Sequence, residues 1–117
     1  MKRILFIDDS DDNLNLYKIY FKKNDNLEVE LCNTPHKGIE TALNNKFDMI
    51  FLDIQMPELS GFDVLKTLRD NNIHTNVFAL TGFSDQDTIS KIEESDFKNY
   101  LKKPILKKDL IRIIEAE

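Results

Sequence analysis

Short apolar runs alternate with longer segments of helical periodicity along the whole chain. The apolar runs cover residues 3–8, 27–32, 48–53, 76–81 and 97–101. The first, third and fourth are almost continuously apolar, which is typical of strands that are buried on both faces of a parallel sheet. The second run alternates between apolar and acidic positions, which predicts a strand at the edge of the sheet.

The segments between these runs carry helix-start signals followed by apolar stripes. The predicted starts are Ser10, Thr34-Pro35, Ser60-Gly61, Ser84 with Asp87, and the residues after Pro104. The stripes are Leu14, Tyr17 and Phe21 within 11–23; Ile39 and Leu43; Phe62, Leu65 and Leu68; Ile89 and Ile92; and Leu110, Ile113 and Ile114. Alternating strands and helices of these lengths predict an α/β fold, a doubly wound parallel sheet with right-handed crossovers. Such folds bind ligands at the carboxyl ends of their strands.

Composition narrows the possible function classes. The chain has 117 residues and a net charge of -5 at pH 7. It contains no repeat or Pro/Gly/Ser linker, so we expect a single domain over 1–117. The acidic balance argues against direct nucleic acid binding. No apolar run approaches the roughly 20 residues that span a bilayer. The apolar stretch at the N-terminus is too short for the core of a signal peptide, so we expect a cytoplasmic protein without membrane partners. The single cysteine, Cys32, excludes an intramolecular disulfide and a cysteine-cluster metal site.

Polar and charged residues that can take part in chemistry lie at the predicted strand ends. The first run ends in Asp8-Asp9, the third in Asp53 and the fourth in Thr81, while Lys103 follows the fifth. In a parallel sheet these ends share one edge, so the side chains are expected to converge. Three carboxylates packed together repel one another, and a hard divalent cation relieves that repulsion. An all-oxygen site points to Mg²⁺ rather than zinc.

Four motifs carry these residues and together resemble a known family. They are Ile7-Asp8-Asp9-Ser10, Leu52-Asp53-Ile54-Gln55-Met56-Pro57 with Ser60-Gly61, Leu80-Thr81-Gly82, and Tyr100-Leu101-Lys102-Lys103-Pro104. In order and spacing the chain resembles, over its whole length, the receiver domain of bacterial two-component response regulators. The resemblance implies a flavodoxin-like fold of five strands in the order 2-1-3-4-5 with five helices.

The resemblance also implies a phosphorylation site with a metal beside it. Asp53 would be the phosphoryl acceptor, a carboxylate nucleophile. Asp9 would bind Mg²⁺ directly and Asp8 mainly through water, with the Asp53 side chain and the Gln55 backbone carbonyl completing the protein ligands. The donor would be a phosphohistidine on a histidine kinase or a histidine phosphotransfer protein.

The remaining roles concern the response to phosphorylation. Thr81 and Lys103 would each bind a phosphoryl oxygen, and relatives usually have a cis bond before the proline that matches Pro104. Thr81 would move towards the phosphoryl group, and Tyr100 would turn inward as the aromatic switch. The downstream protein target would bind the face formed by the fourth helix, fifth strand and fifth helix.

Two features of the chain depart from the pattern that is usual in this family. Asp96-Phe97 stands where Gly-Ala commonly precedes the switch strand, and the larger Phe97 predicts altered local packing. The fourth helix has only Ile89 and Ile92 as strong apolar anchors, so we expect it to be short or mobile.

Several alternatives stay open at this point. The chain is also compatible with a phosphorelay intermediate, or with an excised receiver of a hybrid histidine kinase. A haloacid dehalogenase-type phosphohydrolase is less favoured, because Gln55 stands where that family needs a second aspartate. A flavodoxin-like electron carrier would need a Ser/Thr-rich phosphate loop after the first strand, and no such loop follows it here. We therefore expect a signalling module rather than an enzyme.

Overall fold

Strands and helices alternate along the chain in the computed structural model, which describes residues 1–117. The strands are β1 (Lys2–Ile7), β2 (Leu27–Cys32), β3 (Met49–Asp53), β4 (Asn76–Thr81) and β5 (Asn99–Lys102). The helices are α1 (Asp11–Phe21), α2 (Pro35–Asn44), α3 (Gly61–Asp70), α4 (Gln86–Glu94) and α5 (Lys107–Ala116). All pairings are parallel and the strand order is β2-β1-β3-β4-β5, which confirms the predicted fold class and topology.

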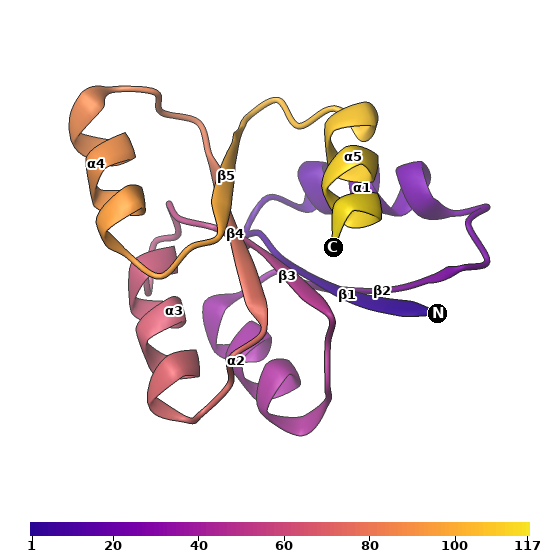
Figure 1. Cartoon of the computed structure of the whole chain (residues 1–117), viewed down its shortest axis with the longest axis horizontal. Helices are drawn as coiled ribbons and strands as arrows, with labels where there is room; N and C mark the ends of the chain where they lie inside the picture. The colour runs from indigo at the N-terminus through magenta and orange to yellow at the C-terminus, as the bar shows by residue number, and fades with distance from the viewer.

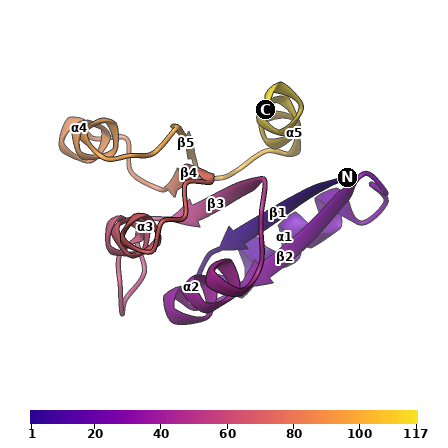
Figure 2. The ribbon, with the colours of Figure 1, turned by 60° about the horizontal axis from the view of Figure 1, so that its bottom comes forward.

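Helices cover both faces of the sheet. Helix α5 lies on the side of the sheet opposite to α2 and α3 (Figures 1 and 2). One core cluster joins α1 and α5 to β1, β3 and β4, and its centre is a row of stacked rings formed by Tyr17, Phe6, Phe51 and Phe78, with centroids 4.5, 4.9 and 5.3 Å apart. A second cluster joins α2 and α3 to the other face. This two-sided burial explains the continuous apolar runs of the central strands.

The edge strand and three helix starts agree with the sequence pattern. Strand β2 alternates between exposed and partly buried residues, as a strand with one free edge should. Ser10, Thr34 and Ser60 cap α1, α2 and α3, and each side chain accepts a hydrogen bond from a backbone N–H of the first turn. Ser60 also forms a reciprocal capping box with Asp63.

The predicted start of the fourth helix is wrong by one residue. Asp85 is the N-cap of α4 and accepts a hydrogen bond from the Thr88 backbone N–H, whereas Ser84 lies outside the helix. The Ser84 hydroxyl instead accepts a hydrogen bond from Lys102 Nζ at 3.0 Å. A carboxylate is the stronger acceptor for a helix N-terminus, and the lysine engages the serine from the neighbouring strand.

Two further expectations are corrected by packing. Leu43 was expected on the buried stripe of the second helix, but its side chain is 49% exposed. The buried residues of α2 are Pro35, Gly38 and Ala42, and the helix approaches β1 so closely that a Cβ at Gly38 would lie 2.5 Å from the Ile7 side chain. The fifth strand begins at Asn99 rather than Phe97, since the Phe97 ring packs edge-on against Phe62 of α3 at 5.7 Å.

Helix α4 buries the fewest residues of the five helices. It has nine residues, one fewer than α2, α3 and α5, and only Ile92 is buried, whereas the mobility of this helix stays a prediction. No helix of the chain combines the length and the apolar character that a membrane span requires.

Candidate functional site

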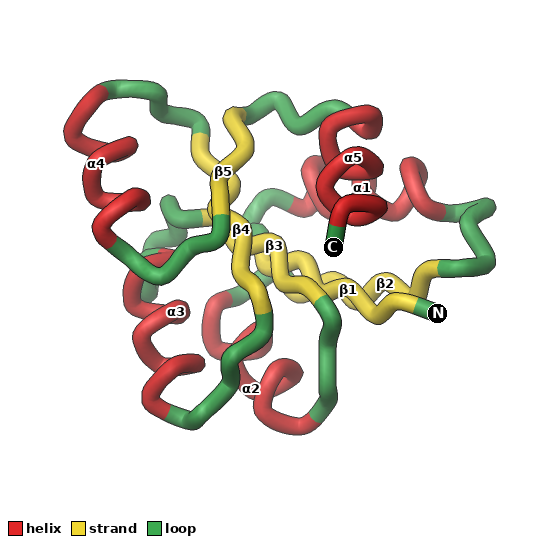
Figure 3. Tube along the Cα trace, in the orientation of Figure 1, coloured by secondary structure: helices red, strands yellow, loops and turns green.

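The loops that follow β1, β3, β4 and β5 all leave the sheet on the side where the parallel strands have their carboxyl ends (Figure 3). Asp8 and Asp9 follow β1, Asp53 and Thr81 are the last residues of β3 and β4, and Lys103 follows β5. One carboxylate oxygen from each of the three aspartates lies within 4.8 Å of the others. The structure therefore brings together the acidic residues that the sequence places at strand ends.

Asp8 is fully buried and its carboxylate is surrounded by donors. Its Oδ1 accepts a hydrogen bond from the Ser10 backbone N–H at 3.0 Å. Its Oδ2 accepts hydrogen bonds from Asn13 Nδ2 at 3.3 Å and from the Tyr17 hydroxyl at 3.2 Å. Lys103 Nζ lies 3.3 Å from the same oxygen. A buried carboxylate needs such donors, because burial removes its hydration.

Asp53 occupies the centre of the site and is 1% exposed. Its Oδ1 accepts a hydrogen bond from the Gln55 backbone N–H at 3.1 Å, and its Oδ2 lies 3.2 Å from Lys103 Nζ. Burial raises the pKa of Asp53 to about 7, and the negative charge of Asp8 adds to this effect. The Gln55 N–H and the Lys103 ammonium oppose the rise in pKa.

Lys103 links the end of β5 to the two buried carboxylates. Its ammonium contacts Asp8 and Asp53 but makes no ion pair with Asp9. Asp9 is exposed, although one of its carboxylate oxygens lies within 4.8 Å of those of Asp8 and Asp53. The backbone N–H of Lys103 donates to the Thr81 carbonyl at 2.7 Å, and the Lys103–Pro104 bond is cis.

The acidic cluster fits a hard divalent cation chemically. Asp8, Asp9 and Asp53 supply carboxylate oxygens without a histidine or cysteine partner. This donor set suits Mg²⁺, which favours a few carboxylates together with water. Asp9 is the exposed member and so is the most accessible to an entering ion. The assignment of the individual ligands, including the Gln55 carbonyl, stays a prediction.

The two residues predicted to switch lie at the ends of β4 and within β5. Thr81 is buried, and its hydroxyl accepts a hydrogen bond from the Phe83 N–H at 3.0 Å and donates one to the Phe83 carbonyl at 3.2 Å. Tyr100 is half-buried and packs against the cluster that contains Ile92 of α4. A pocket of about 460 Å³ between α4 and β5 is lined in part by Tyr100 and Phe97. The Thr81 hydroxyl is thus held by its own loop in this arrangement.

Sequence reasoning placed Tyr17 only on an apolar stripe and overlooked its hydroxyl. The ring is in the core as expected, but the hydroxyl reaches Asp8. The available signal was a tyrosine, rather than a phenylalanine, at a buried position on the helix that follows the aspartate pair. Burial and the neighbouring Asp8 raise the pKa of the Tyr17 phenol above its ordinary value, so it remains a neutral donor.

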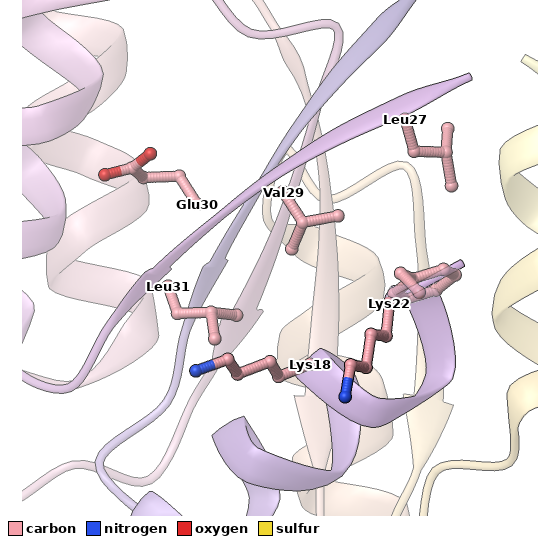
Figure 4. A pocket seen from close by; sticks show the side chains of 7 residues that line it. Lys18, Lys22, Leu27, Val29, Glu30 and Leu31 are labelled. Carbon is pink, nitrogen blue, oxygen red and sulfur yellow. The ribbon is translucent and has the colours of Figure 1, made fainter. Parts of the chain in front are cut away.

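A groove of about 370 Å³ lies away from these residues, between α1 and the free edge of β2 (Figure 4). Its lining residues are Lys18, Phe21, Lys22, Leu27, Val29, Glu30 and Leu31, and the Glu30 side chain points away from Lys18 and Lys22. It shares no residue with the acidic cluster.

Comparison with known proteins agrees with the geometry. A family model described as the response regulator receiver domain matches residues 4–115. The cell cycle transcriptional regulator CtrA of Caulobacter vibrioides is 31% identical over 97% of this chain and 49% of that protein. The chain spans about half the length of this relative, whereas the polar-differentiation response regulator DivK of Brucella anthropi is 26% identical over 98% of this chain and 94% of its own. The receiver domain of a Francisella response regulator is 26% identical, with a TM-score of 0.90 over 99% of this chain and 95% of that domain. Together with the acidic pair, the strand-end aspartate and the lysine at one sheet edge, these matches establish that the chain belongs to the receiver domain family of two-component response regulators.

Proposed function

We propose that this receiver domain accepts a phosphoryl group on Asp53 from a phosphohistidine and thereby changes its affinity for a protein partner. The observation that carries the proposal is that Asp53 lies close to Lys103 and to the acidic pair at the carboxyl ends of the strands. A buried carboxylate beside one ammonium and two further carboxylates is an unfavourable arrangement for stability alone. It suits a site where a cation and a phosphoryl group are to be bound.

The proposed chemistry is phosphoryl transfer to a carboxylate. An oxygen of Asp53 forms a bond to phosphorus while the bond from phosphorus to the donor imidazole nitrogen breaks, and the product is an acyl phosphate. Such transfers depend mainly on positioning and on neutralising charge. Lys103, 3.2 Å from Asp53 Oδ2, is placed to pair with a phosphoryl oxygen, and the Thr81 hydroxyl would bind another. Mg²⁺, held by Asp8, Asp9, Asp53 and the Gln55 carbonyl, would offset the charge of the transferred group.

The proposed response is a shift between two packings of the β4–α4–β5 region. For its hydroxyl to reach a phosphoryl group, Thr81 must give up its bonds to the Phe83 backbone. This movement would open space towards Tyr100, whose half-buried ring would then turn inward. The proposed partner surface is the face of α4, β5 and α5, and the proposed partner there is a protein.

The family match removes two of the alternative functions. A haloacid dehalogenase-type hydrolase and a flavodoxin-like electron carrier would each belong to a different family from the one that matches residues 4–115. A place in a phosphorelay, with Asp53 passing its phosphoryl group to another histidine, uses the same site and stays within the proposal.

Phosphorylation can be tested directly with acetyl phosphate as the donor. Intact mass spectrometry should show one added phosphoryl group in the presence of Mg²⁺ and none in EDTA. Asp53→Asn is expected to abolish the addition, whereas Asp12→Asn, an exposed aspartate in the first turn of α1, should leave it unchanged. An undiminished yield in Asp53→Asn would contradict the assignment of the acceptor.

A further inference from the structure

Tyr17 combines a core position with a polar contact to the site. Its ring is 1% exposed and stacks on Phe6 at 4.5 Å, a role that a phenylalanine would fill equally well. Its hydroxyl lies 3.2 Å from Asp8 Oδ2. A buried hydroxyl must be satisfied by a partner, and here the partner is a fully buried carboxylate of the proposed metal site.

The charges at this point of the site do not balance in the metal-free protein. Asp8 and Asp53 are both buried and share the single ammonium of Lys103. The excess negative charge is spread over neutral donors, of which Asn13 and Tyr17 contact Asp8 Oδ2 directly. Hydrogen bonds to a charged group are stronger than neutral ones, so each donor has a measurable effect.

We infer that Tyr17 is a positioning residue that acts through Asp8: its hydroxyl takes up part of the negative charge of that carboxylate, which stabilises the metal-free fold and weakens cation binding. The inference rests on the proposed metal site and adds to it a residue that sets the affinity of the site. Tyr17 belongs to the core cluster and its hydroxyl donates to Asp8, so it is not one of the proposed metal ligands.

The direction of the effect follows from the donors that remain after the hydroxyl is removed. In Tyr17→Phe, Asp8 still accepts from the Ser10 N–H and Asn13 and still pairs with Lys103. The carboxylate therefore keeps its orientation, and the main change is electrostatic. A less neutralised carboxylate attracts a cation more strongly, so affinity for the ion rises while the metal-free protein loses stability.

The test is a calorimetric titration with MgCl₂ alone, together with urea unfolding in EDTA. Tyr17→Phe is expected to lower the Kd for Mg²⁺ by about tenfold, the change that corresponds to losing one charge-assisted hydrogen bond. Its unfolding midpoint in EDTA should fall at the same time. The matched control is Tyr20→Phe on the same helix, whose hydroxyl donates to the Ile105 carbonyl at 2.8 Å. The control should lose stability without gaining Mg²⁺ affinity.

A double-mutant cycle with Asp8→Asn shows whether Tyr17 acts through that carboxylate. In the Asp8→Asn background, Tyr17→Phe should no longer change the Kd for Mg²⁺. An unchanged or weakened affinity in the single Tyr17→Phe variant, or an equal gain in the Asp8→Asn background, would overturn the inference while leaving the proposed function intact. If the unsubstituted protein binds no Mg²⁺, the proposed metal site fails as well, so the two failures are distinguishable.

Discussion

Asp53→Asn is expected to stabilise the metal-free protein, and to do so in a pH-dependent way. In the folded state burial raises the pKa of Asp53 to about 7, whereas an aspartate in the unfolded chain has an ordinary pKa of 3.8. The folded state therefore binds the proton more tightly than the unfolded state. Protonation of this group stabilises the fold fully below the unfolded pKa, and the contribution is lost as the pH rises through about 7.

The size of the effect follows from linkage. Each pH unit between the folded pKa and a lower pH contributes about 1.4 kcal/mol, so between about pH 8 and about pH 5 wild type gains roughly 3 kcal/mol from this group. An asparagine at position 53 carries no titratable group and shows no such gain. The advantage of Asp53→Asn over wild type should therefore be largest at high pH and should shrink by roughly 3 kcal/mol at about pH 5.

Urea unfolding followed by far-UV circular dichroism in EDTA measures the difference. Titrating groups that do not contact residue 53 affect both proteins equally, so the difference between the two free energies of unfolding is the quantity interpreted. Asp25→Asn, at an exposed position, is the control and should show no pH-dependent difference from wild type. Replacing EDTA by Mg²⁺ should raise wild-type stability at high pH, because the cation binds the ionised carboxylates. A stability difference for Asp53→Asn that is the same at both pH values would refute the reasoning from burial.

Three further predictions test separate contacts. Asp9→Asn is expected to weaken Mg²⁺ binding more than Asp8→Asn, because Asp9 is the exposed carboxylate while Asp8 is engaged by protein donors, and equal losses in a calorimetric titration would count against this order. Lys103→Ala should leave Mg²⁺ affinity intact or increased, since one competing positive charge is gone, but should suppress the chemical-shift changes that beryllofluoride causes in α4 of wild type. Arg69→Ala should lower the free energy of unfolding by about 2 kcal/mol in urea, because the Arg69 guanidinium donates to two backbone carbonyls and pairs with Asp96. Asp96→Ala removes only one largely exposed partner, so it should lower the free energy of unfolding by less than about 1 kcal/mol.

The fold was predictable because burial decides the pattern of its strands. The runs at 3–8, 48–53 and 76–81 are apolar on both faces, since β1, β3 and β4 lie between two layers of helices. The start of α4 was not predictable in the same way. Ser84 and Asp85 are both good capping residues, and the choice between them depends on Lys102, which lies on a neighbouring strand and engages Ser84.

The site was predictable at the level of backbone placement. Parallel topology alone brings the ends of β1, β3 and β4 to one edge, so Asp8, Asp53 and Thr81 had to converge. Side-chain direction is not fixed by topology. Only the structure separates the buried Asp8 from the exposed Asp9 and shows that Lys103 pairs with Asp8 and Asp53.

The weak attachment of α4 makes the proposed switch energetically reasonable. Ile92 is the only buried side chain of this helix, and burying one isoleucine contributes about 1.5–3 kcal/mol. The other contacts of α4 are peripheral, such as that of Lys91 Nζ, 4.3 Å from the Phe62 ring centroid. The loop after α4 is held by the edge-on packing of Phe97 on Phe62 and by the pair of Arg69 with a mostly exposed Asp96 side chain. A new charge-assisted hydrogen bond at the phosphorylated site is worth about 1.5–3 kcal/mol, which is the same order as this attachment. A free energy of that size changes the ratio of two conformations by more than about tenfold. Phosphorylation therefore needs to rearrange only α4 and its neighbours, and the sheet can keep its structure.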